Sequence, residues 1–426
     1  MLRDITAILV HYTNQTVLHK ALASLETITS RLESIIVLQK RGHPLHGSHQ
    51  THSFPPISYI TIEGDDTGET LNQAVTGIHS SYVLFLHETD YLSPTIHVDS
   101  LQISQQATVL GTCNHNQNST SHHPLLVRTS FLKQQPFFST FQLPFKEAFF
   151  PAWLSTIEYS IICFKEDLVR QMRKNTSTTT LEKQKIMQKY QLEKANTNHP
   201  SLSVVISTYN MENYVETAVA SCLLQNEQPD QLLIIDDGST DNSYRRLQRW
   251  NDREGVMVLT KYNGGKARAL NELLPHVTSE FILELDADDW LDPDAVSVIK
   301  KHLSNLPEDI AVLYGNLKKW KQSRGEIFYK GVAKGRLVKG RDDLLAYRFP
   351  LGPRIYRTSS LKMGGGFPVT SFENGRMYED VSVLNRLLKN ARFWYHDFSI
   401  YNVREHPESI TKNNVSNWND FIKILK

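Results

Sequence analysis

The stretch LSVVISTYNMENYVETAVASCLLQNEQPDQLLIIDDGS at residues 202–239 indicates the fold class. It contains two continuous apolar runs, LSVVIS and LLII, of the kind that form strands buried on both faces of a parallel sheet. Between them, apolar residues from Tyr214 to Leu223 recur with the 3.6-residue period of a helix. Further apolar runs follow at 256–259 and 281–285, again separated by helical patterns. This alternation predicts βαβ units and therefore an α/β fold with a mostly parallel sheet.

The N-terminal half of the chain repeats this pattern. YVLFLHETDYLSP at 82–94 lies beside FILELDADDWLDP at 281–293, and Tyr12 lies beside Tyr209. The offset stays between 197 and 199 residues, and a nearly constant offset along the chain indicates an internal repeat. We therefore predict two copies of one Rossmann-like domain in tandem.

The predicted domain boundaries follow from the repeat. We assign residues 1–164 to the first copy and 201–426 to the second. The segment between them, 165–200, is rich in Lys, Glu and Gln, and we expect it to form an exposed helical connector.

Composition places the 426-residue chain among ordinary globular proteins. Lys and Arg total 46 against 45 Asp and Glu, and this net charge of +1 argues against nucleic acid as a partner. Three widely separated cysteines indicate reduced thiols. The sequence has no signal-peptide pattern and no run of about 18 apolar residues. We therefore expect a cytoplasmic protein without a transmembrane segment.

Acidic residues directly follow the predicted strands of the second copy. Asp236 and Asp237 end one strand, and Asp286 and Asp288 end another. Ligands of open parallel sheets bind beyond the carboxyl ends of the strands, and carboxylates suit Mg²⁺ or Mn²⁺ held together with substrate phosphates. The sequence NGGK at 263–266 then begins a helix, where backbone N–H groups and a lysine can meet a diphosphate. A metal and diphosphate site is predicted at this edge of the sheet.

Five segments of the second copy carry a resemblance to a known family. VVISTYNMENYVETAVASCLLQ, LLIIDDGSTD, YNGGKARALNELL, FILELDADDWLDP and YEDVSVLNRLL resemble the successive motifs of family 2 glycosyltransferases, which have the GT-A fold. The resemblance covers about 199–411, and the motifs occur in the family's order and spacing. It implies an inverting transfer from a nucleotide-diphospho-sugar of the UDP or dTDP type to an acceptor hydroxyl, helped by Mn²⁺ or Mg²⁺.

The resemblance also implies roles for individual residues. The nucleotide-sugar is expected to contact Thr208, Tyr209, Asp237, Lys266 and Asp286. The metal is expected to bind Asp288 and His406, although the family more often has Tyr-Arg-x-His where this chain has Tyr-Asn-Val-Arg-Glu-His. Asp380 matches the general base. It precedes an apolar helical pattern, so we expect it at a helix N-terminus, where the dipole favours the carboxylate form that a base needs.

The first copy lacks these residues. Gln39 and Lys40 stand where the second copy has its Asp-Asp pair, and His87 and Thr89 stand where it has Asp286 and Asp288. Pro151 falls opposite the expected general base. We therefore predict a catalytically inactive GT-A-like domain, whose role would be bracing the active domain, forming a homodimer, or gripping an acceptor polymer.

Two other function classes remain open at this point. A nucleotidylyltransferase would need a Gly-rich, basic loop after the first strand, where this chain has Thr208-Tyr209-Asn210-Met211. A carbohydrate-binding or scaffold protein would not need the intact set of aspartates. Length and the two-domain layout resemble enzymes of spore-surface or cell-envelope polysaccharide synthesis, with a carbohydrate or other hydroxyl acceptor. For the tract His43, His46, His49 and His52, adventitious metal binding is the simpler interpretation.

Overall fold

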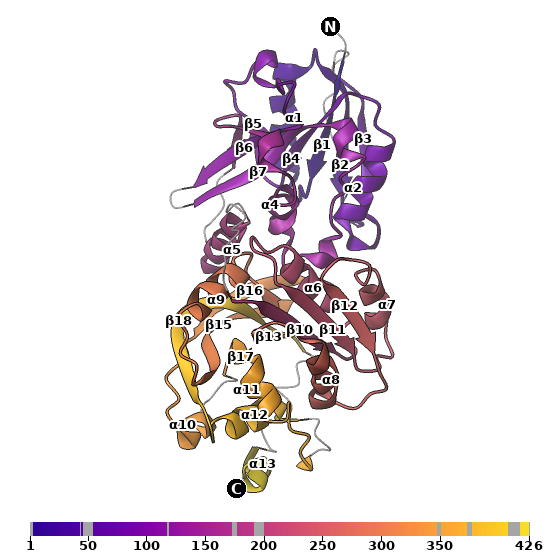
Figure 1. The fold of residues 1–426 in the computed structure, drawn as a ribbon. Helices are drawn as coiled ribbons and strands as arrows, with labels where there is room; N and C mark the ends of the chain where they lie inside the picture. Colours follow the sequence, from indigo (N-terminus) through magenta and orange to yellow (C-terminus); the bar gives the residue numbers. More distant parts are fainter. Residues whose placement is uncertain are drawn as a thin grey trace. The chain divides into compact units, whose positions relative to one another are not determined.

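The computed structural model describes residues 3–42, 44–45, 54–116, 119–172, 177–190, 200–346, 351–372, 377–407 and 418–425. The chain divides into two compact units: one comprises residues up to 191 apart from 141–144, and the other comprises 141–144 and 192–426 (Figure 1). The histidine tract of the sequence analysis, His43, His46, His49 and His52, lies outside the described residues.

The first unit is built on a seven-stranded sheet with the order β3-β2-β1-β4-β7-β6-β8. A two-stranded sheet, β5-β9, accompanies it. Its strands are β1 (Ile5–Val10), β2 (Leu32–Gln39), β3 (Ile57–Thr61), β4 (Tyr82–His87), β5 (Asp90–Leu92), β6 (Val109–Asn116), β7 (Ser119–Arg128), β8 (Ile162–Lys165) and β9 (Val169–Gln171). Its helices are α1 (Gln15–Ser24), α2 (Thr67–Thr76), α3 (Thr129–Leu132), α4 (Phe149–Leu154) and α5 (Thr178–Lys189).

The second unit is built on a nine-stranded sheet with the order β12-β11-β10-β13-β17-β15-β18-β14, and β16 pairs with β15. Its strands are β10 (Leu202–Thr208), β11 (Gln231–Asp236), β12 (Val256–Thr260), β13 (Phe281–Asp286), β14 (Trp290–Leu291), β15 (Ile310–Ser323), β16 (Glu326–Ala333), β17 (Arg354–Arg357) and β18 (Arg392–Glu405). Its helices are α6 (Val215–Leu223), α7 (Ser243–Gln248), α8 (Lys266–Leu273), α9 (Ala295–Leu303), α10 (Arg341–Leu345), α11 (Thr358–Met363), α12 (Glu379–Leu387) and α13 (Trp418–Leu425).

The two sheets correspond strand for strand through their first seven positions. In each, the first four strands in space are parallel, and the fifth, β7 or β17, runs antiparallel to both of its neighbours. The sixth and seventh strands are again parallel to each other, as β6 and β8 or as β15 and β18. The predicted mixed α/β fold with parallel-rich sheets is therefore confirmed.

Burial on both faces explains why the central strands read as continuous apolar runs. Val204 and Ile206 of β10 belong to the same core cluster as Val215 of α6. Val205, between them, faces the other side and shares a core cluster with Leu270 of α8. Because helices cover both faces, the strand ends are held on a rigid sheet, and residues that follow them are well positioned for a site.

The segment predicted as a helical connector is not helical throughout. Residues 165–200 include β9, which pairs antiparallel with β5, and the helical part is α5. Both elements belong to the first compact unit. Pairing with a strand some eighty positions earlier leaves no local signal, which explains why a reading of composition alone missed β9.

Two further features concern the cysteines and the length of the helices. None of the three cysteines, Cys113, Cys163 and Cys222, forms a disulfide. In the described part of the chain, every helix is too short or too polar to span a bilayer.

Candidate active site

The carboxyl ends of three neighbouring strands meet at one edge of the second sheet. Register pairs Thr208 of β10 with Asp236 of β11, and Ser207 of β10 with Asp286 of β13. The backbone N–H of Asp237 donates a hydrogen bond of 2.8 Å to the carbonyl of Thr208. The structure thus places the predicted nucleotide-side residues on adjacent strands. Thr208 is buried and Tyr209 is 45% exposed, so the two differ in their access to a ligand.

Asp237 holds the loop that precedes α8. Its carboxylate accepts hydrogen bonds from the backbone N–H groups of Gly264 at 2.9 Å and Gly265 at 2.7 Å, and from Lys261 Nζ at 3.2 Å. Gly265, the N-cap of α8, has φ 94° and ψ 156°, a conformation that non-glycine residues rarely adopt. The loop therefore has a defined shape, and both oxygens of Asp237 already have partners within the protein.

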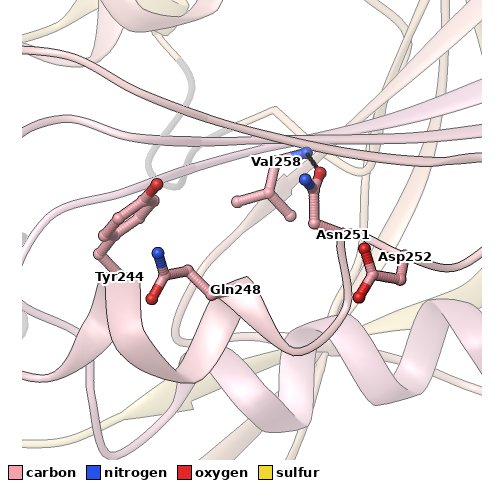
Figure 2. A pocket seen from close by; sticks show the side chains of 5 residues that line it. All are labelled: Tyr244, Gln248, Asn251, Asp252 and Val258. Atoms are coloured by element: carbon pink, nitrogen blue, oxygen red, sulfur yellow. Dashed lines mark hydrogen bonds between the residues drawn. The ribbon is translucent and has the colours of Figure 1, made fainter.

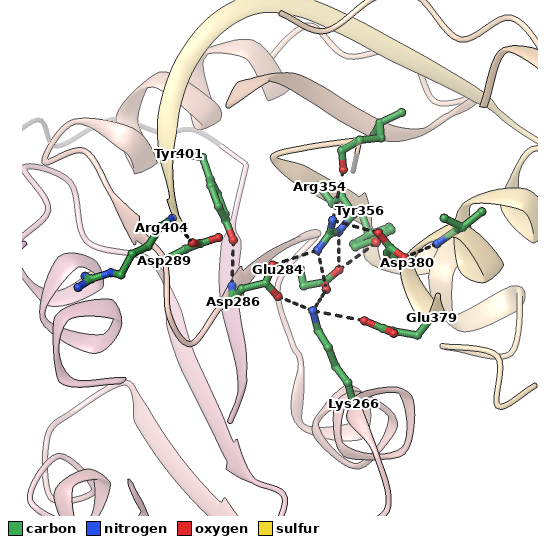
Figure 3. Close-up of polar contacts among 12 residues, drawn as sticks. Lys266, Glu284, Asp286, Asp289, Arg354, Tyr356, Glu379, Asp380, Tyr401 and Arg404 are labelled. Carbon is green, nitrogen blue, oxygen red and sulfur yellow. Dashed lines mark hydrogen bonds and ion pairs between the residues drawn. The ribbon is translucent and has the colours of Figure 1, made fainter. Parts of the chain in front are cut away.

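Lys266, the first residue of α8, joins three carboxylates (Figure 3). Its Nζ forms ion pairs with Asp286, with Glu284 at 2.8 Å and with Glu379 at 3.5 Å. Burial alone would lower the pKa of Lys266, but the three carboxylates outweigh it and raise this pKa well above its ordinary value. Lys266 therefore remains a cation at the edge of the sheet.

Arg354, the first residue of β17, lies opposite Glu284 in the antiparallel pair of β13 and β17. The guanidinium donates to both oxygens of Glu284, from Nε and from Nη2, each at 2.9 Å. Tyr356 donates from its hydroxyl to the same carboxylate at 3.0 Å. Burial would raise the pKa of Glu284, but Arg354 and Lys266 hold it well below its ordinary range. This carboxylate is therefore ionised although it is buried.

Asp380 and Glu379 lie at the start of α12, as the sequence predicts for Asp380. Asp380 Oδ2 lies 3.7 Å from Arg354 Nη1, and its Oδ1 accepts from the backbone N–H of Val381 at 2.8 Å. Burial raises the pKa of Glu379 to about 7, with Lys266 opposing the shift and Asp380 and Glu284 adding to it. The N-cap before them, Tyr378, has the left-handed φ of 57° and stacks on Phe421 of α13.

Asp288 and His406 meet just beyond the C-terminal ends of β13 and β18. His406 Nε2 lies 3.0 Å from Asp288 Oδ2. The side chain of Asp288 is 22% exposed, whereas that of His406 is buried. A carboxylate oxygen beside an imidazole nitrogen is a donor set that suits Mn²⁺ or Mg²⁺ when substrate phosphates complete the shell. Within the described ranges, no group of three or more His, Cys, Asp or Glu side chains could hold a metal alone.

Asp289, next to this pair, has a different environment. It is buried and accepts from the backbone N–H of Arg404 at 2.8 Å. Burial raises the pKa of Asp289 well above its ordinary value, and Asp288 and Asp286 add to the shift. Asp286, the last residue of β13, and Asp288 have side chains that are 35% and 22% exposed, whereas Asp289 is 4% exposed, so Asp286 and Asp288 are the two that are open to a ligand.

The structure brings most of the predicted residues into two groups. Lys266, Asp286 and Asp380 share one network of charges, and Asp288 and His406 form a pair. Thr208, Tyr209 and Asp237 lie at the neighbouring strand ends, and within the described part of the chain no side-chain hydrogen bond or ion pair joins them to either group.

Four residues of this network were not expected from the sequence: Glu284, Arg354, Tyr356 and Glu379. The sequence alone could have identified Glu284, because a charged residue inside the apolar run FILELD needs a buried partner. Arg354 and Tyr356 come from a distant strand, and nothing in the local sequence indicates their pairing.

Two surface hollows of the second unit are lined by residues outside these two groups. One is lined by Tyr244 and Gln248 of α7 together with Asn251, Asp252 and Val258 (Figure 2). Asn251 accepts there from the backbone N–H of Val258 at 3.0 Å. None of these five residues is among those predicted for the site.

Comparison with known proteins gives a family and several relatives. The family model for "Glycosyl transferase family 2" matches residues 203–346. An uncharacterized glycosyltransferase of Haemophilus influenzae is 30% identical over 168 residues, which are 36% of this chain and 67% of that protein. Glycosyltransferase GlyA of Streptococcus pneumoniae is 24% identical over 162 residues, 38% of this chain. The chain covers only 22% of the length of GlyA.

A solved structure also matches. TarS 1–349 of S. aureus in complex with UDP-GlcNAc is 21% identical, with a TM-score of 0.40, and the match covers 53% of this chain and 64% of that one.

Proposed function

The chain belongs to glycosyl transferase family 2, and from this membership we propose that its second unit transfers a sugar from a nucleotide-diphospho-sugar to an acceptor hydroxyl. One observation supports the proposal most. Asp286 and Asp380, from the donor motif and the expected base motif, both lie 3.7 Å from the guanidinium of Arg354. The two motifs are 94 residues apart in sequence and contribute to one site, as a transfer reaction requires.

We propose that the donor is of the UDP or dTDP type. Tyr209 offers an exposed aromatic ring at the end of β10, and an aromatic ring is suited to stack on a nucleobase. Asp286, which is partly exposed and pairs with Ser207 of the neighbouring strand β10, is assigned to the ribose side. Asp237 matches the base-contacting carboxylate of the family, and its own hydrogen bonds to Gly264 and Gly265 support a second role in shaping the loop.

The diphosphate is assigned to the start of α8. The backbone N–H groups of the first turn and the positive end of the helix dipole favour an anion there. Lys266 adds a cation, and Asp286, Glu284 and Glu379 hold its side chain in place. These contacts also mean that a diphosphate would have to share Lys266 with carboxylates.

We propose a dependence on Mn²⁺ or Mg²⁺, held by Asp288 and His406 together with the donor phosphates. A bound divalent cation would stabilise the negative charge that develops on the departing nucleoside diphosphate. Asp288 and His406 contribute one oxygen and one nitrogen, and the partly exposed face of Asp288 leaves room for phosphate oxygens.

We propose inversion at the anomeric carbon, with Asp380 as the general base. Asp380 would take the proton of the acceptor hydroxyl while that oxygen attacks from the face opposite the leaving group. Asp380 lies at the N-terminus of α12, where the helix dipole is positive, and its Oδ2 is 3.7 Å from Arg354 Nη1.

We propose that the first unit is an inactive copy of the same domain. The shared strand order supports this, because unrelated sheets of seven strands rarely agree in every pairing. β2 ends in Gln39 where β11 ends in Asp236, and β4 ends in His87 where β13 ends in Asp286. Pro151, predicted opposite Asp380, is buried inside α4.

We place the reaction in cell-envelope or spore-surface polysaccharide synthesis, with a carbohydrate or other hydroxyl-bearing acceptor. The first unit would then brace the second, form a homodimer, or grip the acceptor.

Nucleotide release from a panel of nucleotide-sugars, with Mn²⁺ or Mg²⁺ present and with chelator, tests the proposal. We expect release from at least one UDP- or dTDP-sugar, only with metal, and its loss in Asp288→Ala. Asp252→Ala, at an exposed position outside the site, is the matched control and should retain the rate. Transfer that persists in Asp288→Ala would contradict the assignment. Metal-dependent binding of the donor without turnover would favour a carbohydrate-binding protein instead.

A further inference from the structure

Glu284 is a charged residue in the middle of the most buried part of the second sheet. It lies in β13, two residues before Asp286, and is 1% exposed. Four donors meet its two oxygens: Nε and Nη2 of Arg354, Nζ of Lys266 at 2.8 Å, and the hydroxyl of Tyr356. A buried carboxylate with this many partners is fully satisfied, which removes the usual cost of burying a charge.

Arg354 extends this arrangement to both halves of the proposed site. Its Nη1 donates to the carbonyl of Leu351 at 3.3 Å and lies 3.7 Å from Asp380. Its Nη2 binds Glu284 and lies 3.7 Å from Asp286. The planar guanidinium therefore stands between the carboxylate at the end of β13 and the carboxylate at the start of α12, as Figure 3 shows.

We propose that Glu284 and Arg354 form a brace that positions Asp380 against the donor side of the site. This inference rests on the proposed function. Glu284 orients the guanidinium by a two-point hydrogen bond, and the oriented guanidinium holds Asp286 and Asp380 at fixed places on either side. Both members are positioning residues, since they act through the two aspartates.

The two aspartates depend on the brace to different degrees. Asp286 also has Lys266 as a cationic partner. For Asp380, Arg354 is the one cationic side chain within 4.0 Å among the residues that the structure describes. Loss of the guanidinium should therefore affect the proposed base more than the donor-side carboxylate.

The test is steady-state kinetics of Arg354→Gln, with the donor identified by the release assay. We expect kcat to fall about 100-fold, the size of effect that misplacing a reacting group by about 1 Å produces. The donor KM should change less than kcat, because Lys266 still holds Asp286. Arg354→Lys should recover part of kcat, and Glu284→Gln should lower kcat in the same direction.

Arg357→Gln is the matched control. Arg357 ends the same strand, and its guanidinium donates to the backbone carbonyls of Ile310 at 3.0 Å, Pro307 at 2.8 Å and Leu306 at 3.5 Å and lies over the ring of Phe281. Its replacement should lower stability without the change in kcat. A kcat within twofold of the unaltered protein in a folded Arg354→Gln would overturn the brace.

A measurement without turnover separates the brace from the proposed function. Urea unfolding of Arg354→Gln, Asp380→Asn and the double variant gives the coupling between the two side chains. We expect the double variant to depart from additivity by at least threefold in the unfolding equilibrium constant. Additive effects would overturn the inference. If the unaltered protein releases no nucleotide from any donor, the proposed function is wrong. The unfolding measurements on the two single variants and the double variant would still show whether Arg354 and Asp380 are coupled, as the brace requires.

Discussion

At the scale of single residues, Asp237 shows that one carboxylate can shape a loop as well as face a ligand. Both of its oxygens accept from the protein: Gly264, Gly265 and Lys261 supply the donors. A sequence motif identifies such a residue without revealing these bonds, because the donors come from a loop about 27 residues further along the chain.

Asp237→Asn should lower the free energy of unfolding by about 2 kcal/mol, because hydrogen bonds to a charged acceptor are lost and an amide N–H₂ group now faces backbone donors. Urea unfolding measures the change. Asp252→Asn, at an exposed position, should stay within about 0.5 kcal/mol of the unaltered protein. Equal stability of the two variants would show that the loop does not depend on Asp237.

His406→Ala should raise the Mn²⁺ concentration for half-maximal nucleotide release by roughly 10- to 100-fold, because Asp288 would lose its neighbouring nitrogen donor. Titration of the release rate with Mn²⁺ measures this. His302→Ala removes a histidine that stacks on Phe398 instead, and its Mn²⁺ requirement should be unchanged. An unchanged requirement in His406→Ala would remove His406 from the proposed metal site.

The sequence predicted three members of the charge network but did not predict Glu284 and Arg354, which connect them. Lys266, Asp286 and Asp380 lie in recognisable motifs and do meet in the structure. Glu284 carried a readable signal as a charge within an apolar strand. Arg354 did not, since its partner is 70 residues away and the pairing exists only in the folded sheet.

At the scale of elements, the loop that precedes α8 and the first turn of this helix act as one structural unit. Gly265 supplies a backbone conformation at φ 94° and ψ 156°, which lets its N–H point at Asp237 while α8 begins at Lys266. The sequence NGGK predicted a helix opening here, and the structure confirms it. The conformation of each glycine was not predictable, because either one could have supplied the turn.

Gly265→Ala should destabilise the second unit by about 1–3 kcal/mol and weaken donor binding, because a Cβ makes this backbone conformation costly. Gly264→Ala is the matched control: its Cβ would meet Lys261 Nζ, the end of a flexible side chain, at 2.8 Å, so a smaller loss is expected. Thermal unfolding with and without UDP measures both. A larger loss in Gly264→Ala would show that the critical glycine is the other one.

The apolar pattern of the sequence predicted the first four, parallel strands of each sheet better than the later strands, which include antiparallel pairs. The apolar runs at the start of both units became β1, β4, β10 and β13 with the expected parallel pairing. The antiparallel insertion of β17 between β13 and β15 was not predicted. Its four residues pair with strands far away in sequence, and short strands of this kind carry no periodic signal.

At the scale of the whole molecule, the two units differ in what occupies equivalent strand ends. The second unit has carboxylates and two cations there. The first has His11 and His87, whose Nδ1 and Nε2 atoms lie 2.9 Å apart, and the other nitrogen of His11 lies 2.8 Å from the hydroxyl oxygen of Thr67. The rings of His87 and His123 stack with centroids 6.1 Å apart. We therefore expect the first unit to lose stability in acid.

Burial lowers the pKa of His11 and of His123 to about 4 in the folded chain, against an ordinary value of 6.5. Between these values the unfolded chain binds more protons than the folded one, so stability must fall as the pH drops from about 6.5 to about 4. Each histidine contributes at most about 3 kcal/mol. Urea unfolding at several pH values should show this slope, and His123→Leu should flatten it.

His79→Gln, at an exposed position in the same unit, is the control and should leave the slope as it is. If His123→Leu and the unaltered protein lost stability equally between these pH values, acid sensitivity would come from elsewhere in the chain.

The agreement in strand order has a consequence for how the chain is made. Because both sheets have the same strand order, a strand of one sheet could pair with strands of the other during folding, which is a typical hazard of repeated domains. Synthesis from the N-terminus separates them in time. At 5–20 residues per second, residues 192–426 need roughly ten seconds or more to emerge, long enough for the first sheet to close before its counterpart exists. Refolding from denaturant releases both sets of strands together, and there the exchange has no such protection.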